Sequence, residues 1–173
     1  MSIMNNMQKQ SNSQFSPLVS RPDMPEYRLL AANQGRGLLP WEWARQRLQN
    51  SRNYWVATTR PDKRPHLTAV WGIWWDEVFY FSTGRLARKS RNLAQNPGCV
   101  VSTESAAEAV IVEGVASIIS DPEILRQIAQ AYRAKYGSAY PDDSNVFAVQ
   151  PKVVFGFIEA ETEFAGSATR WYF

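Results

Sequence analysis

The residues best placed to do chemistry form one short stretch, in which hydroxyls and a glycine are followed by cations. Ser82-Thr83-Gly84 closes an apolar run, and the basic segment Arg85–Arg91 follows at once. Hydroxyls and backbone N–H groups at a helix start can bind an anion, and Arg and Lys neutralise its charge. The stretch therefore predicts a phosphate-binding site, with an ordinary turn before a solvated helix face as the alternative.

The rest of the composition limits other chemistries. One cysteine, Cys99, and one histidine, His66, exclude a multi-cysteine or His-based metal site, so we expect no metal. A net charge of +3 is too mild to predict a nucleic-acid partner by itself. No run approaches the ~18 apolar residues of a membrane helix, and the N-terminus lacks an apolar signal-peptide core. We therefore expect a cytoplasmic protein with no membrane partner.

The elements that must position the basic stretch are a hairpin and a helix. Two apolar runs, Leu67–Trp75 and Val78–Phe81, are joined by Asp76-Glu77, which predicts a β-hairpin. The following segment, Ala87–Gln95, is expected to be helical. The hydroxyls and the cations would therefore meet where the second strand ends and the helix begins.

The remaining chain is patterned mostly for strands. Strands are expected at Tyr54–Thr59, Cys99–Glu104, Ala109–Ile119, Val146–Val149, Val153–Ile158 and Thr169–Phe173. Helices are expected over Pro40–Asn50 and from Asp121 to Gly137, the second with an aspartate N-cap and a glycine stop. Residues 1–26 show no periodicity, so we expect a flexible arm before one domain, 27–173.

These patterns predict a mainly β fold of six or seven antiparallel strands, Greek-key-like, with two or three inserted helices. Gly114 lies within an expected strand, which suggests a bulge or a bend. Many short strands and a mid-strand glycine favour a small closed barrel over a sandwich.

Several motifs in this pattern resemble the pyridoxamine 5'-phosphate oxidase-like, FMN-binding split-barrel family. The matching motifs are Arg64–Trp71, Tyr80–Gly84, Ala87–Pro97 and the closing Ala168–Phe173. The similarity runs from about Leu39 to the C-terminus. It implies a split β-barrel that binds FMN at the subunit interface of a homodimer.

The resemblance also implies cofactor-binding roles for nine residues. The hydroxyls and the Arg-Lys pair expected at the phosphate are Ser82, Thr83, Arg88 and Lys89. The residues expected beside the flavin are His66, Val70 and Trp71 from the strand before the hairpin, and Arg170 and Trp171 from the chain end, which can come from the partner subunit. No catalytic residue and no particular small-molecule substrate are identified.

By resemblance, the function is that of an FMN-dependent oxidoreductase that transfers a hydride between a reduced cofactor and a small organic substrate. Flavin carries the redox chemistry, so no acid–base dyad is required. The sequence closes at Phe173 without the longer basic segment of true pyridoxamine phosphate oxidases, so we expect a divergent branch of the family.

Three alternatives stay open. One is a reductase that uses the deazaflavin F420, and another is a non-catalytic flavin or haem binder of the same fold. The third is a barrel that binds single-stranded nucleic acid through stacked aromatics and phosphate contacts. The cations gather at one helix start, which favours a single phosphate over a nucleic acid.

Overall fold

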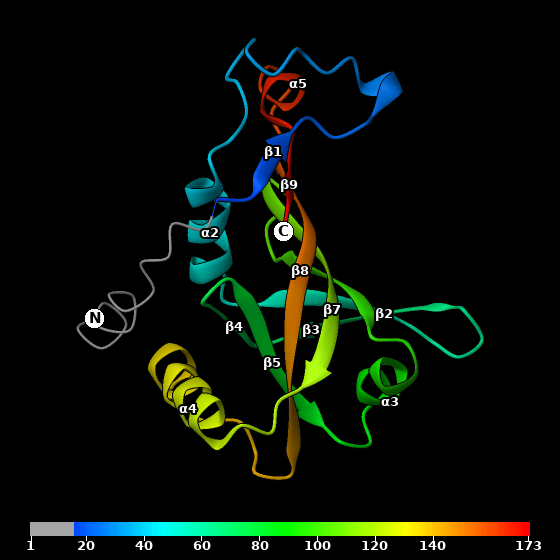
Figure 1. Cartoon of the computed structure of the whole chain (residues 1–173), viewed down its shortest axis with the longest axis vertical. Helices are drawn as coiled ribbons and strands as arrows, with labels where there is room; N and C mark the ends of the chain where they lie inside the picture. The colour runs from blue at the N-terminus through cyan, green and yellow to red at the C-terminus, as the bar shows by residue number, and fades with distance from the viewer. Residues whose placement is uncertain (1–15) are drawn as a thin grey trace.

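The structure is a computed structural model that describes residues 16–173, and antiparallel strands dominate it (Figure 1). The strands are β1 (Leu18–Ser20), β2 (Tyr54–Thr59), β3 (Pro65–Val70), β4 (Gly72–Trp75), β5 (Val78–Gly84), β6 (Gly98–Thr103), β7 (Glu108–Ile118), β8 (Ser144–Ile158) and β9 (Thr169–Tyr172). The helices are a 3-10 turn, η1 (Pro25–Tyr27), and α2 (Trp41–Asn50), α3 (Arg88–Gln95), α4 (Pro122–Tyr136) and α5 (Phe164–Ser167). The predicted mainly β class is confirmed.

The number of elements differs from the prediction, which was six or seven strands and two or three helices. Over residues 16–173 there are nine strands and four α-helices. The expected run Leu67–Trp75 breaks at Trp71 into β3 and β4. Two expected strands, Val146–Val149 and Val153–Ile158, are instead one continuous strand, β8.

Part of the segment expected to be a flexible arm is a strand. Residues 1–15 of that segment lie outside the described part of the chain. β1 pairs antiparallel with β9, with Leu18 opposite Tyr172. The Arg21 side chain then donates to the carbonyls of Ala168 at 2.7 Å and Gly166 at 2.9 Å. These bonds fix residues 18–21 against the end of the chain.

The sheet is open, so the expectation of a closed barrel is wrong and that of a split barrel is confirmed. Its main path runs β1-β9-β8-β7-β6-β2-β3, and β4 pairs only with β5. β8 links the two parts, because its first half pairs with β5 and its second half with β9, while β7 runs along the other side. The chain turns from β3 into β4 without pairing them, and this leaves β3 as a free edge.

The bulge predicted at Gly114 is present and lets β7 bend. The register between β7 and β8 shifts between Glu113 and Gly114, so that Gly114 faces Pro151. A Cβ at Gly114 would overlap the carbonyl oxygen of Gln150. Only glycine fits this close approach of two backbones.

The predicted hairpin is confirmed at Asp76-Glu77, the turn between β4 and β5. Both residues have left-handed backbone angles, φ 50° and 59°, as a two-residue hairpin turn of type I′ requires. The Glu77 carboxylate helps to hold the turn in these left-handed angles by accepting hydrogen bonds from Trp41 Nε1 at 2.9 Å and Arg45 Nε at 2.8 Å. The turn is therefore fastened to α2.

Two apolar clusters lie on the two faces of β5. Phe79 and Phe81 point into the barrel interior, where they join the residues that α2 covers. Val78 and Tyr80 point the other way and pack with Ile128 of α4. Figure 1 shows α4 and α3 on opposite sides of the lower part of the sheet. Within residues 16–173, no helix is long and apolar enough to cross a membrane.

Candidate functional site

The two hydroxyls at the end of β5 lie on opposite faces of the strand. Because side chains alternate along a strand, Thr83 follows Phe81 on the interior face and Ser82 follows Tyr80 on the face toward α4. Thr83 is buried, and its cross-strand partner Asn145 donates to Ser90 Oγ of α3 at 3.2 Å. Of the two predicted hydroxyls, only Thr83 therefore lies on the same side of the strand as α3.

Helix α3 begins with cations and without a side-chain cap. Ala87 occupies the N-cap position and makes no side-chain hydrogen bond, and no acidic residue lies in the first turn. Arg88 and Lys89 are the first two helical residues. The N-terminus of a helix carries a partial positive charge and free N–H groups, so two cations there are unfavourable unless an anion joins them.

A polar cluster links α3 to the β2–β3 pair. Asn92 of α3 is fully buried and donates from Nδ2 to Thr58 Oγ1 at 2.9 Å. The same Thr58 oxygen lies 3.4 Å from His66 Nδ1 on β3. Thr58 therefore links His66 to Asn92 of α3.

Three buried polar atoms around this cluster have no hydrogen-bond partner. They are Arg60 Nε, Thr68 Oγ1 and Asn92 Oδ1. Arg60 continues the face of β2 that carries Thr58, and Thr68 follows His66 on the same face of β3. Buried groups without partners are costly and rare in folded proteins. Together they offer two possible donors and one acceptor to a ligand.

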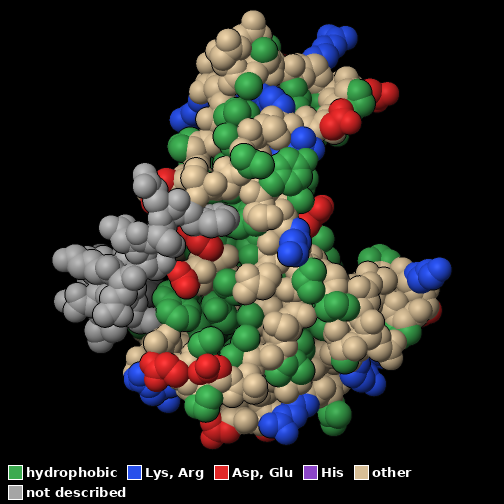
Figure 2. Space-filling model, in the orientation of Figure 1, with side chains coloured by type: hydrophobic (Ala, Val, Ile, Leu, Met, Phe, Trp, Pro, Cys, Tyr) green, Lys and Arg blue, Asp and Glu red, His purple; other side chains and the backbone are tan. Residues whose placement is uncertain are grey.

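The electrostatics of this cluster are strongly positive. Partial burial lowers the pKa of His66, and the positive charges of Arg60, Lys89 and Arg88 lower it further. Burial alone lowers the pKa of Lys89. Within the described part of the chain, none of the three cations forms a salt bridge. On the face in Figure 2, Lys and Arg side chains also lie over the β2–β3 turn and at the lower right, where α3 lies.

Trp71 occupies the break between β3 and β4, at the other end of the edge strand. Its side chain is 45% exposed and stacks on Tyr136 of α4, with ring centroids 4.5 Å apart and planes within 3°. Its carbonyl accepts a hydrogen bond from the Tyr132 hydroxyl at 2.8 Å. Helix α4 therefore fixes both the ring and the backbone of Trp71.

The other predicted residues lie apart from this cluster. Val70 is buried in the core, and Trp171 is 1% exposed and packs edge-on against Trp41. Arg170 lies on the opposite face of β9, where its Nε donates to Ser20 Oγ at 3.2 Å and its guanidinium covers the Tyr172 ring. A fully packed Trp171 has no surface left for a ligand, so we assign it to the core.

Sequence reasoning missed four residues of the polar cluster: Thr58, Arg60, Thr68 and Asn92. Thr58 and Arg60 are spaced by two along a strand, and Asn92 follows Arg88 by four along a helix. These spacings put each pair on one face. The pairing of β2 with β3 and α3 was needed to bring them together.

Comparison with known proteins assigns the fold to a family. The sequence pattern of the family described as Pyridoxamine 5'-phosphate oxidase matches residues 41–158. That range includes the strands from β2 to β8 together with α2, α3 and α4. The chain therefore belongs to the pyridoxamine 5'-phosphate oxidase family, as the motifs indicated. No curated protein is similar enough in sequence to serve as a relative.

Several solved structures share the fold at low sequence identity. A conserved hypothetical protein, Rv2991 of Mycobacterium tuberculosis, is 21% identical with a TM-score of 0.61, over 78% of this chain and 85% of that one. An F420 reductase is 24% identical with a TM-score of 0.54, over 63% and 93%. HutZ, a heme storage protein of Vibrio cholerae, is 20% identical with a TM-score of 0.54, over 65% and 87%. At these identities the likeness concerns the fold alone.

Proposed function

We propose that this protein is an FMN-dependent oxidoreductase whose cofactor phosphate binds at the start of α3. The observation that supports this most is the set of three cations, Arg60, Arg88 and Lys89, which surround His66 without an acidic partner among residues 16–173. A phosphate would remove the mutual repulsion of these cations and accept from the free N–H groups of the helix.

The residues present fit the remainder of such a cofactor. The unpartnered Arg60 Nε and Thr68 Oγ1 can donate to phosphate or hydroxyl oxygens, and Asn92 Oδ1 can accept from a hydroxyl. Thr83 lies on the same side of β5 as α3 and stays in the proposed site. The backbone of β3, from His66 to Val70, would then run beside the ring system.

The proposed flavin, when bound, would supply the hydride chemistry, and the protein would supply position and charge. Arg88 and Lys89 would anchor the phosphate, and His66 would be held in place by Thr58. Trp71 and the free edge of β3 would border the ring end of the cofactor. No acid–base pair is needed for this role.

The exposed face of the sheet supports a homodimer with the cofactor at the subunit interface. Leu67 of β3 is 59% exposed, and Tyr172 of β9 and Leu18 of β1 are 40% and 77% exposed. Leu67 lies at one end of the sheet path, and Tyr172 and Leu18 lie at the other; exposed apolar side chains of this size support an interaction surface. A second copy packed on it would cover β3, the strand that borders the proposed cofactor.

An absorption spectrum of the purified protein, with mass spectrometry of the ligand released on denaturation, tests this proposal. Flavin absorption and released FMN would support it. If the protein binds added F420 in preference to FMN, the proposed cofactor becomes F420, and the proposed phosphate site is kept. Release of haem, or no binding of any of the three, would overturn the oxidoreductase proposal.

A further inference from the structure

We propose that Tyr132 of α4 is a positioning residue for the proposed cofactor, because its hydroxyl holds the end of β3 away from the end of β5. The inference rests on the proposed function and adds a residue that lies outside the polar cluster. The Tyr132 hydroxyl donates to the Trp71 carbonyl at 2.8 Å and accepts from the Ser82 N–H at 3.1 Å. Trp71 directly follows β3, and Ser82 lies near the end of β5. One side chain therefore joins the two strands that carry the proposed site.

The hydroxyl takes the place of a hydrogen bond between strands. The pairing of β4 with β5 ends where Gly72 lies opposite Phe81. If the pairing continued by one position, Trp71 would lie opposite Ser82, and an N–H of one strand could bond directly to a carbonyl of the other. Instead, the Tyr132 hydroxyl lies between these two groups, and two hydrogen bonds in series replace one. The inserted hydroxyl therefore sets the distance between the strands where the sheet splits.

The ring that carries this hydroxyl is fixed in place. Tyr132 is 2% exposed, and its ring packs edge-on against Tyr140 with centroids 5.4 Å apart. Burial raises the pKa of Tyr132 above its ordinary value, so the hydroxyl keeps the proton that it donates to the Trp71 carbonyl. Figure 1 shows α4 beside β4 and β5, on the side away from α3. A packed helix thus delivers the hydroxyl to the split, and the ring has no room to turn away.

The neighbouring polar side chains of α4 hold only one of the two strands. The Tyr136 hydroxyl accepts from the Gly72 N–H at 2.8 Å, and Lys135 Nζ donates to the Gly72 carbonyl at 3.0 Å. Gly72 is the first residue of β4. Of these three side chains, only Tyr132 also bonds to β5 within residues 16–173. The separation of the strands therefore depends on Tyr132 and not on α4 as a whole.

The two strands carry different parts of the proposed site. Ser82 precedes Thr83 on β5, and the cross-strand partner of Thr83 is Asn145. Asn145 donates to Ser90 Oγ of α3 at 3.2 Å, so the end of β5 is linked to the helix that would bind the phosphate. The other strand, β3, would run beside the ring system. A cofactor that spans both strands binds best when their separation is set beforehand, and the backbone beside a flavin ring tunes its electronic properties.

The variant Tyr132→Phe removes the hydroxyl and keeps the ring. We expect it to bind FMN tenfold or more weakly in a fluorescence titration. The visible circular dichroism of flavin bound at saturation should also change, because the strands beside it move. Tyr140→Phe is the matched control, since the Tyr140 hydroxyl belongs to the same cluster but donates to the Leu125 carbonyl of α4 itself at 3.0 Å. The control should lose stability in urea denaturation and leave both FMN measurements unchanged.

The outcomes of this comparison separate the inference from the proposed function. Unchanged FMN affinity and dichroism in Tyr132→Phe would overturn the inference. Equal changes in Tyr132→Phe and Tyr140→Phe would also overturn it, because they would follow from lost stability alone. Either result leaves the proposed function standing. If the unmodified protein binds no FMN, the proposed function is contradicted, and the inference falls with it.

Hydrogen exchange in the unmodified protein gives a second test, which decides the inference even if Tyr132→Phe does not fold. FMN should bind only the state in which the Ser82 N–H is bonded to the Tyr132 hydroxyl. Saturation with FMN should therefore slow exchange of the Ser82 amide at least tenfold. The Ile124 amide, which bonds to the Asp121 side chain at the start of α4, should exchange equally fast with and without FMN. An unchanged rate for the Ser82 amide would overturn the inference.

Discussion

Helices α3 and α4 begin in opposite ways, and the contrast separates a helix start that the chain itself caps from one that has no side-chain cap. In α4, the Asp121 side chain accepts from the N–H groups of Glu123 at 2.8 Å and Ile124 at 3.2 Å. In α3, the equivalent position is Ala87, which caps nothing. Asp121 and Glu123 place negative charge at the start of α4, whereas α3 starts with two cations.

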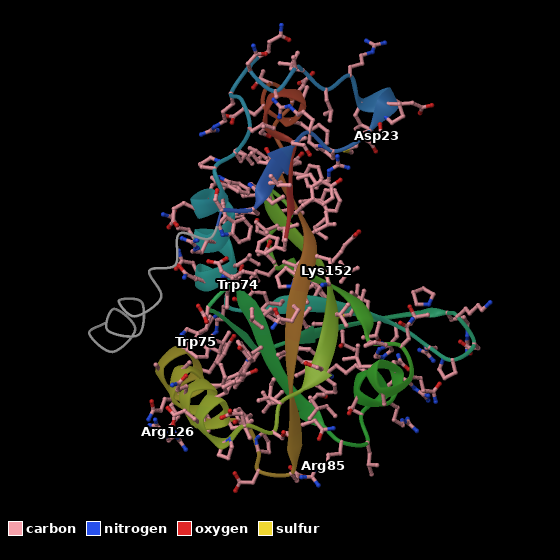
Figure 3. The ribbon with its side chains drawn as sticks, in the orientation of Figure 1. Asp23, Trp74, Trp75, Arg85, Arg126 and Lys152 are labelled. Atoms are coloured by element: carbon pink, nitrogen blue, oxygen red, sulfur yellow. The ribbon has the colours of Figure 1, made fainter. Side chains whose placement is uncertain are left out.

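The other end of α4 also follows the rules for a stable helix. Arg133 and Lys135 lie in its last turn, and Gly137 ends it with φ 80°. Cations there are favourable to the helix dipole, and glycine accepts the left-handed angle without strain. Arg126, which points outward from α4 in Figure 3, pairs with Glu123 on the solvent side. Each end of α4 is thus satisfied by the chain itself.

The start of α3 has neither a side-chain cap nor an acidic residue in its first turn, whereas the start of α4 has both. Each cation at a helix N-terminus costs ~0.3–1 kcal/mol relative to a neutral residue. The partial burial of Lys89 adds to this cost, because burial disfavours its charged form and lowers its pKa. An arrangement that is unfavourable without an anion and favourable with one is expected of a binding site. Four experiments test this contrast.

Removal of the cations of α3 should have the largest effect. In the variant Arg88→Ala with Lys89→Ala, two charge-assisted hydrogen bonds of ~1.5–3 kcal/mol each would be lost. We expect the affinity for FMN to fall by about a hundredfold or more, as measured by fluorescence titration. The free energy of unfolding without ligand should not decrease. A variant that binds FMN normally would show that the cations of α3 do not hold the phosphate.

The buried lysine of α4 should make stability depend on pH. Burial lowers the pKa of Lys135 to about 8, below its ordinary 10.5. Between these values the unfolded chain binds a proton that the folded chain has released, so the free energy of unfolding rises with pH. The slope cannot exceed ~1.4 kcal/mol per pH unit. Urea denaturation at pH 7.5 and 9.5 measures it.

The nearby tyrosines and the variant Lys135→Met determine how the result of this pH experiment is interpreted. Burial raises the pKa of the neighbouring Tyr54 and Tyr136, so their ionisation opposes stability only above pH 10. In Lys135→Met the rise of stability between pH 8 and 10 should become clearly smaller. The remaining slope comes from Lys89, whose pKa burial also lowers, and from Cys99, whose pKa burial raises to about 12 so that its ionisation in the unfolded chain opposes stability. An unchanged slope in this variant would assign the rise to groups other than Lys135. FMN affinity at pH 7 should be the same in both proteins.

Loss of the α4 cap should affect stability alone. Asp121→Ala leaves two N–H groups without their acceptor, and such a loss costs ~1 kcal/mol. We expect this decrease in the free energy of unfolding, measured by urea denaturation, with no change in FMN affinity. Asp121→Asn is the matched control, because it keeps an accepting side chain and should retain most of the stability. Weaker FMN binding by Asp121→Ala would show that the two helices are coupled.

The smallest effect concerns the pH dependence of binding. Partial burial and then the nearby cations hold the pKa of His66 below its ordinary value, and a bound phosphate would raise it. Binding should therefore take up a proton, and the affinity for FMN should rise a few-fold as pH falls from 7.5 to 6.5. The proton uptake is measured by calorimetry in buffers of different ionisation enthalpy. In His66→Gln the proton uptake should decrease by the part that His66 supplies, because the FMN phosphate, with a second pKa of ~6, exchanges protons in both proteins. An unchanged uptake would exclude His66 as its source.

The sequence was most informative where structure depends on local residues. The strand Tyr54–Thr59 and the cap and glycine stop of α4 were predicted at the residues where they occur, because alternation and capping act over a few positions. The bulge at Gly114 was predicted for the same reason. At these places the local preference agrees with the final structure.

Distant contacts explain what was not predicted. The apolar run through Trp71 is continuous, and its break depends on Tyr132 and Tyr136, more than sixty positions away in the chain. The closing aromatic run predicts a docked strand, but only the packing against Trp41 shows that Trp171 belongs to the core. The polar cluster likewise needs β2, β3 and α3 together. The basic motif therefore predicts part of the proposed site, and the remaining residues are brought together only by the tertiary structure.

Comparison of FMN with riboflavin tests the phosphate site most directly, since the two ligands differ only in the phosphate. Fluorescence titration of the ligand-free protein with each gives the two dissociation constants. If the start of α3 binds the phosphate, FMN binds at least a hundredfold more tightly than riboflavin, and the difference shrinks to a few-fold in the Arg88→Ala, Lys89→Ala variant. Equal affinities of the unmodified protein for the two ligands would contradict the assignment of α3 as the phosphate site.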